Sequence, residues 1–422
     1  MKPLVLFASL LSLATGVAAA EITPQVILPK HRLEARELAI IVNDRDPLSR
    51  EIGAYYRQQR NIPAANVIRV EFAPDRPHLG TDEFIAIKEQ VDAATAPHIH
   101  AYVLTWAAPY RVECMSITSA FAFGFDRRWC SKERCATTQP SQYFASDSVA
   151  PYSDFKIRPT MALAAEDFAA AKALIDRGIA SDGTRPEGTA YLVSTSDKAR
   201  NVRAALFGRI ERLFGPAVKT RIVESNRLIG RDDVLFYFTG LAKVEGLGTL
   251  EFRPGAVADH LTSAGGKLTN SGQMSALRWL EAGATGSYGT VVEPCAHPQK
   301  FPNPGLVMQH YLRGETLIEA YWKSVQMPGE GIFIGEPLAA PFDFRDIEVR
   351  QNELVLHTWS LRPGVYRLQT APTLVGPYRS EPQGFRVGFP VQPLRIPNTG
   401  AAIYRLAPVP APLPGGIQKG TQ

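Results

Sequence analysis

The sequence has no long apolar run after its first 20 residues, only four cysteines and no cluster of like charges. About 18 consecutive apolar residues are needed to span a bilayer, so we expect no stable membrane insertion of the mature chain. Lysine and arginine (46) nearly balance aspartate and glutamate (41), and the net charge of +5 is spread along the chain. This pattern predicts no nucleic-acid partner. It leaves the oligomeric state open.

Motifs that identify common enzyme classes are missing as well. No GxGxxG or GxxxxGK[ST] follows an expected strand, so nothing predicts a nucleotide cofactor. There is no GxSxG nucleophile turn and no HExxH metal site. The segment CSKERC, from Cys130 to Cys135, does not have zinc-ligand spacing, and no second cluster follows it. We therefore expect no cofactor and no bound metal.

The N-terminus has the order of a secretory signal. Lys2 supplies a basic start, a short apolar segment follows, and Ala18-Ala19-Ala20 ends it with small residues. This order predicts a signal peptide at residues 1–20 with cleavage after Ala20, followed by a linker at 21–37. The mature chain is then secreted or periplasmic. A buried N-terminal helix is the alternative interpretation.

Strand and helix patterns alternate from Leu38 to Pro341. Short apolar runs predict strands at 38–44, 100–106, 189–194, 234–240, 284–292 and 331–335. Amphipathic stretches predict the helices between them, including helices around Ala256 and Ala276. Such alternation indicates an α/β fold with mostly parallel, doubly wound sheets in two similar halves, at 38–160 and 161–342. The irregular, cysteine-containing stretch at 109–160 reads as an ordered insertion in the first half.

Beyond Pro341 the pattern changes to short strands separated by proline and glycine. The runs ELVLHTW, GVYRLQT, GFRVGF and AIYRLAP show no helical period. They predict a small antiparallel, β-sandwich-like domain at residues 343–410. Residues 411–422 have the composition of a disordered tail.

Candidate binding residues follow the expected strands, because open α/β sheets bind ligands beyond the carboxyl ends of their strands. The candidates for binding at these strand ends are Asp44, Asp46, Trp106, Gly240, Glu293 and Glu336. Asp44 and Asp46 are equally typical of helix caps. A carboxylate metal site built from Asp44, Glu293 and Glu336 is a third and weaker hypothesis.

Candidate catalytic residues come from the segment GSYGTVVEPCAHPQKFP. Cys295 lies just past a strand, His297 follows two residues later, and His260 precedes both in the chain. A thiol with an imidazole in contact can act as a nucleophile. Neighbours at i and i+2 in a loop do not ensure that contact, and Glu293 carries the charge that raises a thiol pKa.

The four cysteines permit two disulfides, since an exported chain meets an oxidising compartment. Cys130 and Cys135 are close enough in sequence to bridge across a turn, so we expect that pair. Cys114 then pairs with Cys295, or both stay reduced. Three connectivities are open to four cysteines, and sequence alone does not choose among them.

Several stretches resemble an uncharacterised family of secreted bacterial proteins that occur alongside exosortase protein-sorting systems. The resemblance covers most of the chain from Leu38 to Phe342 and implies no established activity. It is carried by VNDRDPLSREIGAYYRQQRNIP, VECMSITSAFAFGF, GAVADHLTS, GATGSYGTVVEPCAHPQKFP and EAYWKSV.

The second half is also similar in layout to the gingipain-type, caspase-like cysteine peptidases. In that family one strand ends in Thr-Gly-His-Gly, which supplies the histidine, and the next core strand ends at the cysteine. Here FYFTG matches up to Gly240, GEPL (335–338) is similar to a late Gly-Asp-Pro element, and Cys295 lies just past the following strand. The histidine position, however, is occupied by Leu241. A thiol without its base loses thiolate formation and proton delivery, so the resemblance implies the fold more than the activity.

Two functional hypotheses follow. In the first, the protein is a secreted, non-catalytic protein on a caspase-like scaffold that binds a peptide or a cell-surface polymer. In the second, it is a secreted cysteine peptidase that uses Cys295 with His297 or His260. A free thiol at Cys295 would separate the two hypotheses.

Overall fold

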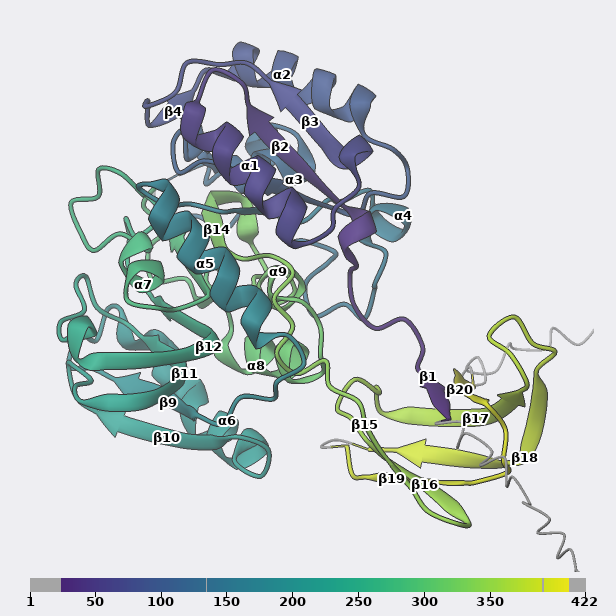
Figure 1. The fold of residues 1–422 in the computed structure, drawn as a ribbon. Helices are drawn as coiled ribbons and strands as arrows, with labels where there is room; N and C mark the ends of the chain where they lie inside the picture. The colour runs from purple at the N-terminus through teal and green to yellow at the C-terminus, as the bar shows by residue number, and fades with distance from the viewer. Residues whose placement is uncertain (1–23, 134, 389–390, 410–422) are drawn as a thin grey trace, which may run out of the picture.

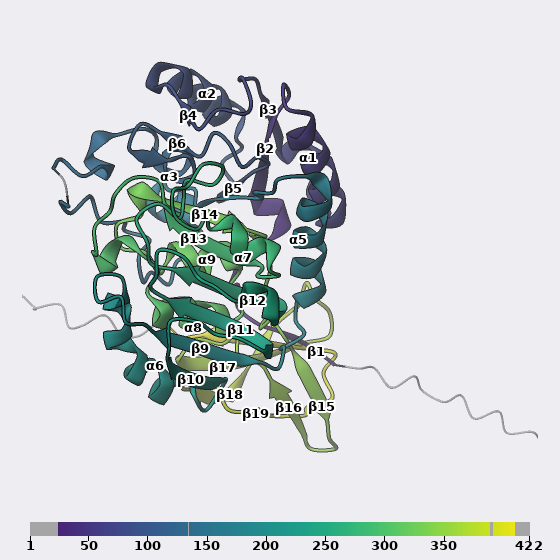
Figure 2. The ribbon, with the colours of Figure 1, turned by 90° about the vertical axis from the view of Figure 1, so that its left-hand side faces the viewer.

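The computed structural model describes residues 24–133, 135–388 and 391–409, and its core is one ten-stranded sheet. The predicted signal peptide at 1–20 and the predicted tail at 411–422 lie outside the described residues. Figure 2 shows the core strands stacked from one edge of the sheet to the other. In sheet order they are β10 (Lys219–Glu224), β9 (Thr189–Ser194), β11 (Arg231–Thr239), β12 (Leu250–His260), β13 (Gly286–Thr290), β14 (Gly331–Gly335), β8 (Thr160–Ala162), β5 (Ala101–Leu104), β2 (Leu38–Asn43) and β3 (Val67–Val70).

Every neighbouring pair in this sheet is parallel except the central pair. Strands β13 and β14 run antiparallel, with Gly286 opposite Gly335 and Thr290 opposite Gly331. The sheet therefore consists of two parallel sets, β10 to β13 and β14 to β3, that point in opposite directions. The predicted α/β class is confirmed, but the two halves share a single sheet.

Helices cover both faces of the sheet. On one face α1 and α5 lie side by side, and on the other α6, α8 and α9 pack together (Figures 1 and 2). The α1 helix begins at Pro47, where Asp46 caps it by accepting a hydrogen bond from the Leu48 amide. The helices of the core are α1 (Pro47–Gln59), α2 (Thr81–Ala94), α5 (Phe168–Ser181), α6 (Phe207–Phe214), α7 (Leu277–Glu281), α8 (Pro304–Leu312) and α9 (Leu317–Trp322).

One predicted helix is wrong. The segment around Ala256 lies inside β12, an eleven-residue strand between β11 and β13. Pro254 and Gly255 interrupt its local pattern, and Gly255 takes a positive φ of 84°. The register between β11 and β12 shifts there, as expected for a bulge. Pairing with β11 decides the conformation of this segment, against its local signals.

The insertion forms short elements that are anchored to the sheet. They are β6 (Arg111–Val112), β7 (Met115–Ser116), α3 (Ile117–Phe123) and α4 (Pro151–Phe155). Strands β6 and β7 form a small three-stranded sheet with β4 (His78–Leu79), which precedes the insertion. A buried lysine provides one anchor, because Lys300 Nζ donates to Ser131 Oγ at 2.7 Å and to Glu330 Oε2 at 2.8 Å.

Two disulfides join the insertion to its surroundings, and the expected Cys130–Cys135 bridge is wrong. Cys114 pairs with Cys130, and Cys135 pairs with Cys295, with Cα separations of 5.8 Å and 5.2 Å. Cys130 is buried next to Cys114, whereas Cys135 is half-buried on the far side of the turn. The two ends of CSKERC therefore face different parts of the protein. Disulfides of this kind are typical of proteins that fold in an oxidising compartment.

The C-terminal domain, residues 346–409 together with β1, consists of two sheets packed face to face. One sheet has the order β15-β16-β19 and the other β1-β20-β17-β18. Leu354, Ile396, Leu368, Phe385 and Tyr404 are among the residues of the shared core. The strands are β15 (Asp346–Val349), β16 (Glu353–His357), β19 (Leu394–Pro397), β1 (Gln25–Ile27), β20 (Ile403–Pro408), β17 (Gly364–Ala371) and β18 (Arg379–Val387).

Part of the segment expected as a linker at 21–37 belongs to this domain. Strand β1 pairs in parallel with β20, so residues 25–27 complete a sheet whose other strands come from the end of the chain. Farther along, His31 Nε2 lies 2.8 Å from Asp343 Oδ1, and Arg32 Nε donates to Asp343 Oδ2 at 2.7 Å. These contacts tie the start of the described chain to the connection between the core and the C-terminal domain.

Candidate functional site

The residues predicted to form a site lie at opposite edges of the sheet. Because β13 and β14 are antiparallel, Glu293 follows one end of this pair and Glu336 follows the other. Asp44, Asp46 and Trp106 follow β2 and β5, which are parallel to β14 and so share the edge of Glu336. Gly240, His260, Glu293, Cys295 and His297 belong to the other edge. The hypothesis of a metal site from Asp44, Glu293 and Glu336 is therefore wrong.

Cys295 is not a nucleophile in this structure, because its sulfur is bonded to Cys135. Its amide donates a 2.9 Å hydrogen bond to Glu293 Oε1, which orders the loop after β13. None of the four cysteines is free. The disulfide thus accounts for both a cysteine and a carboxylate that the sequence offered as site residues.

His260 is a buried structural residue. Trp279 Nε1 donates to His260 Nδ1 at 2.9 Å, and His260 Nε2 donates to the Met274 carbonyl at 3.2 Å. Both ring nitrogens are therefore in use. Burial lowers the pKa of the His260 imidazole to about 3, so the ring is neutral at physiological pH. It has no free nitrogen with which to accept a proton from a substrate.

His297 serves the same disulfide loop. Its Nε2 donates a 2.6 Å hydrogen bond to the backbone carbonyl of Cys135. The ring is half-buried at the end of the segment that Cys295 joins to the insertion. His297 joins the segment after β13 to the insertion and, like His260, is not paired with a thiolate.

The polar candidates at the other edge also have structural partners. Asp44 pairs with Arg69 at 2.5 Å, and Asp46 caps α1. Trp106 is buried, donates to the Pro109 carbonyl at 3.2 Å and packs against aromatic neighbours. Glu336 is buried in an ion pair with Arg60 and accepts a 2.6 Å hydrogen bond from the Tyr56 hydroxyl.

Gly240 is required for close packing. A Cβ atom at this position would lie 2.0 Å from the carbonyl oxygen of Arg200. The carboxyl edge of β11 is thus closed by the segment that follows β9. A buried ion pair lies beneath it, where Arg203 Nη2 approaches Asp259 Oδ1 at 2.6 Å and donates to the Thr239 carbonyl at 2.7 Å.

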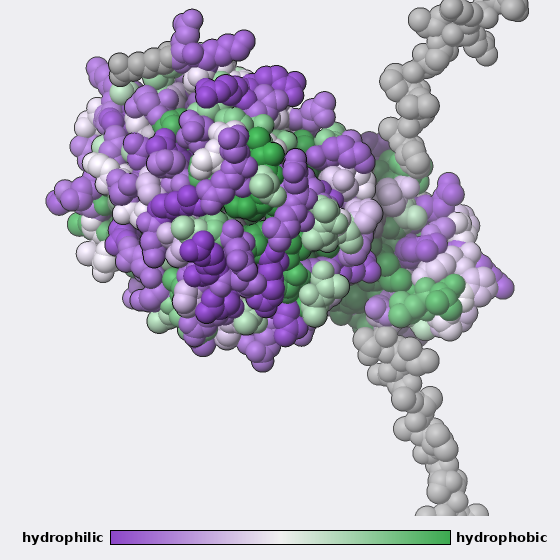
Figure 3. Space-filling view, turned by 90° about the horizontal axis from the view of Figure 1, so that it is seen from above, coloured by the Kyte–Doolittle hydropathy of each residue, from purple (hydrophilic) through white to green (hydrophobic). Residues whose placement is uncertain are grey.

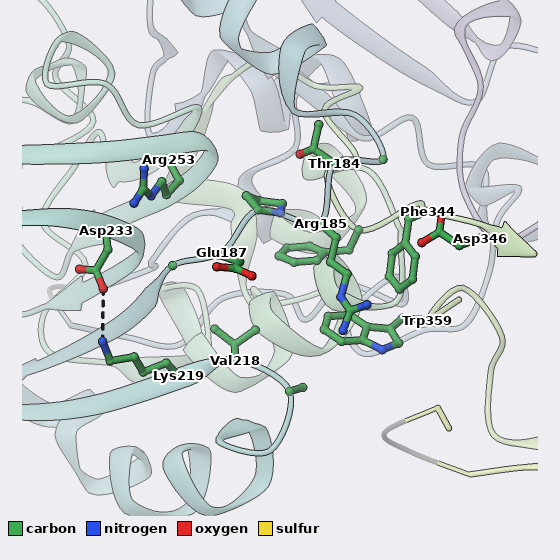
Figure 4. Close-up of a pocket in the computed structure, with 15 residues that line it drawn as sticks. Thr184, Arg185, Glu187, Val218, Lys219, Asp233, Arg253, Phe344, Asp346 and Trp359 are labelled. Atoms are coloured by element: carbon green, nitrogen blue, oxygen red, sulfur yellow. Dashed lines mark ion pairs between the residues drawn. The ribbon is translucent and has the colours of Figure 1, made fainter. Parts of the chain in front are cut away.

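A large cleft lies at the opposite, amino-terminal edge of β9 to β12, where the core meets the C-terminal domain (Figure 4). We call it the interdomain cleft, and its volume is about 810 Å³. Gly188 precedes β9, Lys219 begins β10, and Asp233 and Arg253 lie near the starts of β11 and β12. Its lining residues are Gly183, Thr184, Arg185, Pro186, Glu187, Gly188, Ala217, Val218, Lys219, Asp233, Arg253, Phe342, Phe344, Asp346 and Trp359.

Aromatic and charged groups both line the interdomain cleft. The Arg185 guanidinium lies 5.0 Å from the ring centre of Phe344 and 4.8 Å from that of Trp359, within the range of a cation–π interaction (Figure 4). The carboxylates of Glu187 and Asp346 add opposite charges. Phe344 is buried and Trp359 half-buried, with the Arg185 guanidinium against both rings, so the cleft offers mainly hydrogen-bonding groups of both signs beside the exposed part of Trp359.

Asp233 is held in its ionised form at one end of the cleft. Burial raises its pKa, but hydrogen bonds from Thr189 (2.6 Å) and Tyr191 (2.7 Å) outweigh burial, so the net pKa is lowered. Lys219 Nζ lies 3.6 Å from Asp233 Oδ2 (Figure 4). Burial, together with Asp233, raises the pKa of Tyr191 to about 12. Asp233 is therefore ionised and Tyr191 protonated near neutral pH, so neither changes its charge there.

Sequence reasoning missed the interdomain cleft because it considered only the carboxyl ends of strands. The signal that could have found it is the pair of aromatic residues, Phe344 and Trp359, at the start of the C-terminal domain. Clefts between domains are common binding sites. No group of three or more metal-ligating side chains is found within the described ranges.

Comparisons with protein-family models, with curated proteins and with solved structures found no match to this chain. In the part of the chain that the structure describes, no helix is long and apolar enough to cross a membrane. The geometry of the site is therefore the main guide to function.

Proposed function

We propose that this is a secreted or periplasmic, non-catalytic binding protein on a caspase-like scaffold, which holds a peptide segment in the interdomain cleft. The observation that carries the non-catalytic part is the state of the three candidate catalytic residues. Cys295 is oxidised, both nitrogens of His260 are hydrogen-bonded, and His297 is bound to a backbone carbonyl. No thiol–imidazole pair remains among them.

The order of the strands supports the same conclusion. In the gingipain-type layout the core strand that comes next after the histidine strand ends at the cysteine, and the sequence predicts Cys295 in that place. The strand beside β11 is β12, and it ends at His260, followed by Leu261 and Thr262. Cys295 follows β13, one strand farther away. With Leu241 after β11, neither position of the catalytic pair carries the residue that the chemistry needs.

The chemistry of the interdomain cleft favours a peptide over a polyanion. Arg185, Lys219 and Arg253 face the same space as Glu187 and Asp346, so a uniformly charged polymer would meet repulsion as well as attraction. A peptide supplies side chains of both signs, backbone groups for hydrogen bonds and a side chain that contacts the half-buried Trp359 ring beside Arg185. An uncharged surface polysaccharide is the second ligand class that such a surface accommodates.

Selection of a random displayed peptide library on the immobilised, non-reduced protein tests this proposal. We expect enriched peptides to bind the wild-type protein and to lose at least tenfold in affinity when Trp359→Ala or Glu187→Gln is introduced. Ile229→Ala is the matched control, because Ile229 is exposed outside the cleft. A panel of neutral surface polysaccharides is measured alongside.

Three outcomes distinguish the hypotheses. Peptides that bind equally well to the cleft variants would place the site elsewhere. Binding of polysaccharide alone, sensitive to Trp359→Ala, would replace the peptide by a polymer. Cleavage of any selected peptide by the non-reduced protein would overturn the non-catalytic reading, whichever residue proves responsible.

A further inference from the structure

The loop between β17 and β18 carries two exposed apolar side chains. Val375 is 94% exposed and Leu374 is 56% exposed, the highest values among the large apolar residues that the structure describes. Figure 3 shows exposed apolar side chains gathered on the C-terminal domain beside hydrophilic neighbours. Single exposed apolar residues are ordinary on protein surfaces, but two adjacent ones at a loop tip form a small apolar projection.

Hydrogen bonds hold this tip in a defined shape. The Gly376 amide donates to the Thr373 carbonyl at 3.0 Å, and Thr373 Oγ1 donates to the Gly376 carbonyl at 2.9 Å. The Tyr378 hydroxyl donates to the Leu374 carbonyl at 2.7 Å. The loop thus presents Leu374 and Val375 to solvent as a preformed turn, and ordering it on contact with a partner requires little entropy.

Arginines surround the loop and continue along the outer face of the adjoining sheet. The Arg405 guanidinium stacks on the Tyr378 ring at 3.4 Å, and Arg405 Nε donates to Gln369 Oε1 at 2.8 Å. Arg379 begins β18 directly after the loop. Farther along the same sheet face, Arg386 is paired with Val365 and Arg367 with Gly384 in the strand register.

Strands β17, β18 and β20 carry four arginines beside a single carboxylate, that of Glu381, which accepts a 2.9 Å hydrogen bond from Thr370 Oγ1. Arg367, Arg379 and Arg386 are exposed, and no ion pair to a described residue is seen for any of them. Residues 346–409 contain seven arginines and no lysine. We call Leu374, Val375, Arg379, Arg405 and the outer-face arginines Arg367 and Arg386 the basic loop surface.

We propose that the basic loop surface docks this protein on an anionic membrane surface. Leu374 and Val375 enter the boundary between headgroups and acyl chains, Tyr378 lies at the interface, and the arginines bind lipid phosphates. Amphipathic tyrosines favour that depth, and guanidinium groups match phosphate geometry. The contact is peripheral, and it is compatible with the absence of a spanning helix in the described chain.

The apolar side chains at the loop tip favour a membrane over a soluble polyanion as the partner of this surface. A polymer lying along the sheet would use the arginines but would leave Leu374 and Val375 in water. A lipid bilayer uses both, since weak surface binding generally needs an apolar insertion together with electrostatic attraction. The site lies on the C-terminal domain, apart from the residues that line the interdomain cleft.

Vesicle flotation with the full, non-reduced protein tests the proposal. The anionic probe is a vesicle of phosphatidylethanolamine with about 30 mol% phosphatidylglycerol, which gives a strongly anionic surface. The neutral probe is a vesicle of phosphatidylcholine alone. We expect binding to the anionic vesicles that weakens at high salt, and little binding to the neutral ones. Leu374→Asp with Val375→Asp should reduce the partition coefficient at least tenfold, and Arg367→Gln with Arg386→Gln about fivefold or more per arginine.

Matched variants separate the proposal from general effects of charge and hydropathy. Val349→Asp changes an apolar residue, 52% exposed on β15, in the other sheet of the same domain. Arg209→Gln removes an exposed arginine on α6. Both should bind anionic vesicles as the wild-type protein does. Loss of binding in either control would show that the basic loop surface is not the determinant.

Two further results would overturn the proposal. One is failure of the wild-type protein to bind anionic vesicles at low salt. The other is binding to soluble dextran sulfate that requires the arginines, combined with affinities for dextran sulfate and for vesicles that are both unchanged by substitution of Leu374 and Val375. That pattern would assign the surface to an acidic polymer.

Discussion

Replacing His260 by glutamine should make the stability of this protein less sensitive to acid. The folded protein keeps the His260 imidazole neutral, with a pKa lowered to about 3 by burial, whereas an exposed histidine has a pKa of about 6.5. Below pH 6.5 the unfolded chain therefore binds a proton that the folded chain refuses. This group withdraws stability as the pH falls from about 6.5 towards 3. Glutamine retains one acceptor for Trp279 and one donor for Met274 but has no charge to gain.

The two pKa values set the size of the effect. Between pH 7 and pH 5 the linkage relation gives a loss of about 2 kcal/mol in the free energy of unfolding from this one residue. Urea unfolding of the wild-type protein and of His260→Gln at both pH values measures it. The variant's own packing defect cancels, because the comparison is between the two pH dependences. We expect the wild-type protein to lose about 2 kcal/mol more than the variant over this interval.

Equal losses in the two proteins would refute the reasoning, since they would mean that His260 titrates alike in the folded and unfolded chains. That result would also reopen the catalytic hypothesis. An imidazole that titrates near pH 6.5 has a nitrogen accessible to protons, as a general base requires. The measurement thus tests the structural and the functional assignment of His260 together.

Three other predictions follow from packing and from the disulfides. Cys135→Ser, Cys295→Ser and the double variant should each lower the free energy of unfolding by the same amount, about 5 kcal/mol for a bridge that closes so long a loop. The non-reduced wild-type protein should take up no iodoacetamide at Cys295. Asp259→Ala should lower the free energy of unfolding by about 3–5 kcal/mol, because it leaves Arg203 charged, buried and unpaired. In a double-mutant cycle, adding Arg203→Met to Asp259→Ala should recover part of this loss. Gly240→Ala should cost about 1–3 kcal/mol in thermal unfolding, because the added methyl group meets a backbone oxygen, and an unchanged melting temperature would contradict the packing role.

Much of the α/β core could be predicted from local sequence patterns. The runs at Leu38–Asn43, Thr189–Ser194 and Gly331–Gly335 are strands as expected, because each is a short apolar segment that the fold buries on both faces. Strand β12 could not be predicted in this way. Its sequence contains Pro254 and Gly255, and only its pairing with β11 selects the extended conformation.

The candidate site was less predictable, because it depends on which strands are neighbours and in which direction they run. The antiparallel pair β13 and β14 reverses the direction of half of the sheet. Residues that all follow strands in the sequence, such as Asp44 and Glu293, therefore end at different edges. The disulfide pairing has the same origin, since Cys135 and Cys295 are 160 residues apart and meet only through the tertiary fold.

These features together leave the amino edge of strands β9 to β12, and not their carboxyl edge, open to a ligand. At the carboxyl edge of β11 to β13, Gly240 packs against the Arg200 carbonyl, His260 is fully hydrogen-bonded, and the Cys135–Cys295 bridge fastens the insertion to the loop after β13. This is where an α/β sheet ordinarily binds, and the structure uses it for stability. The open space lies instead at the amino edge, between the core and a C-terminal domain that β1 and Asp343 tie in place. We therefore expect substitutions in the C-terminal domain to lower the affinity for a ligand. Substitution of Cys295 should lower the stability of the protein and leave the ligand affinity of the folded protein unchanged.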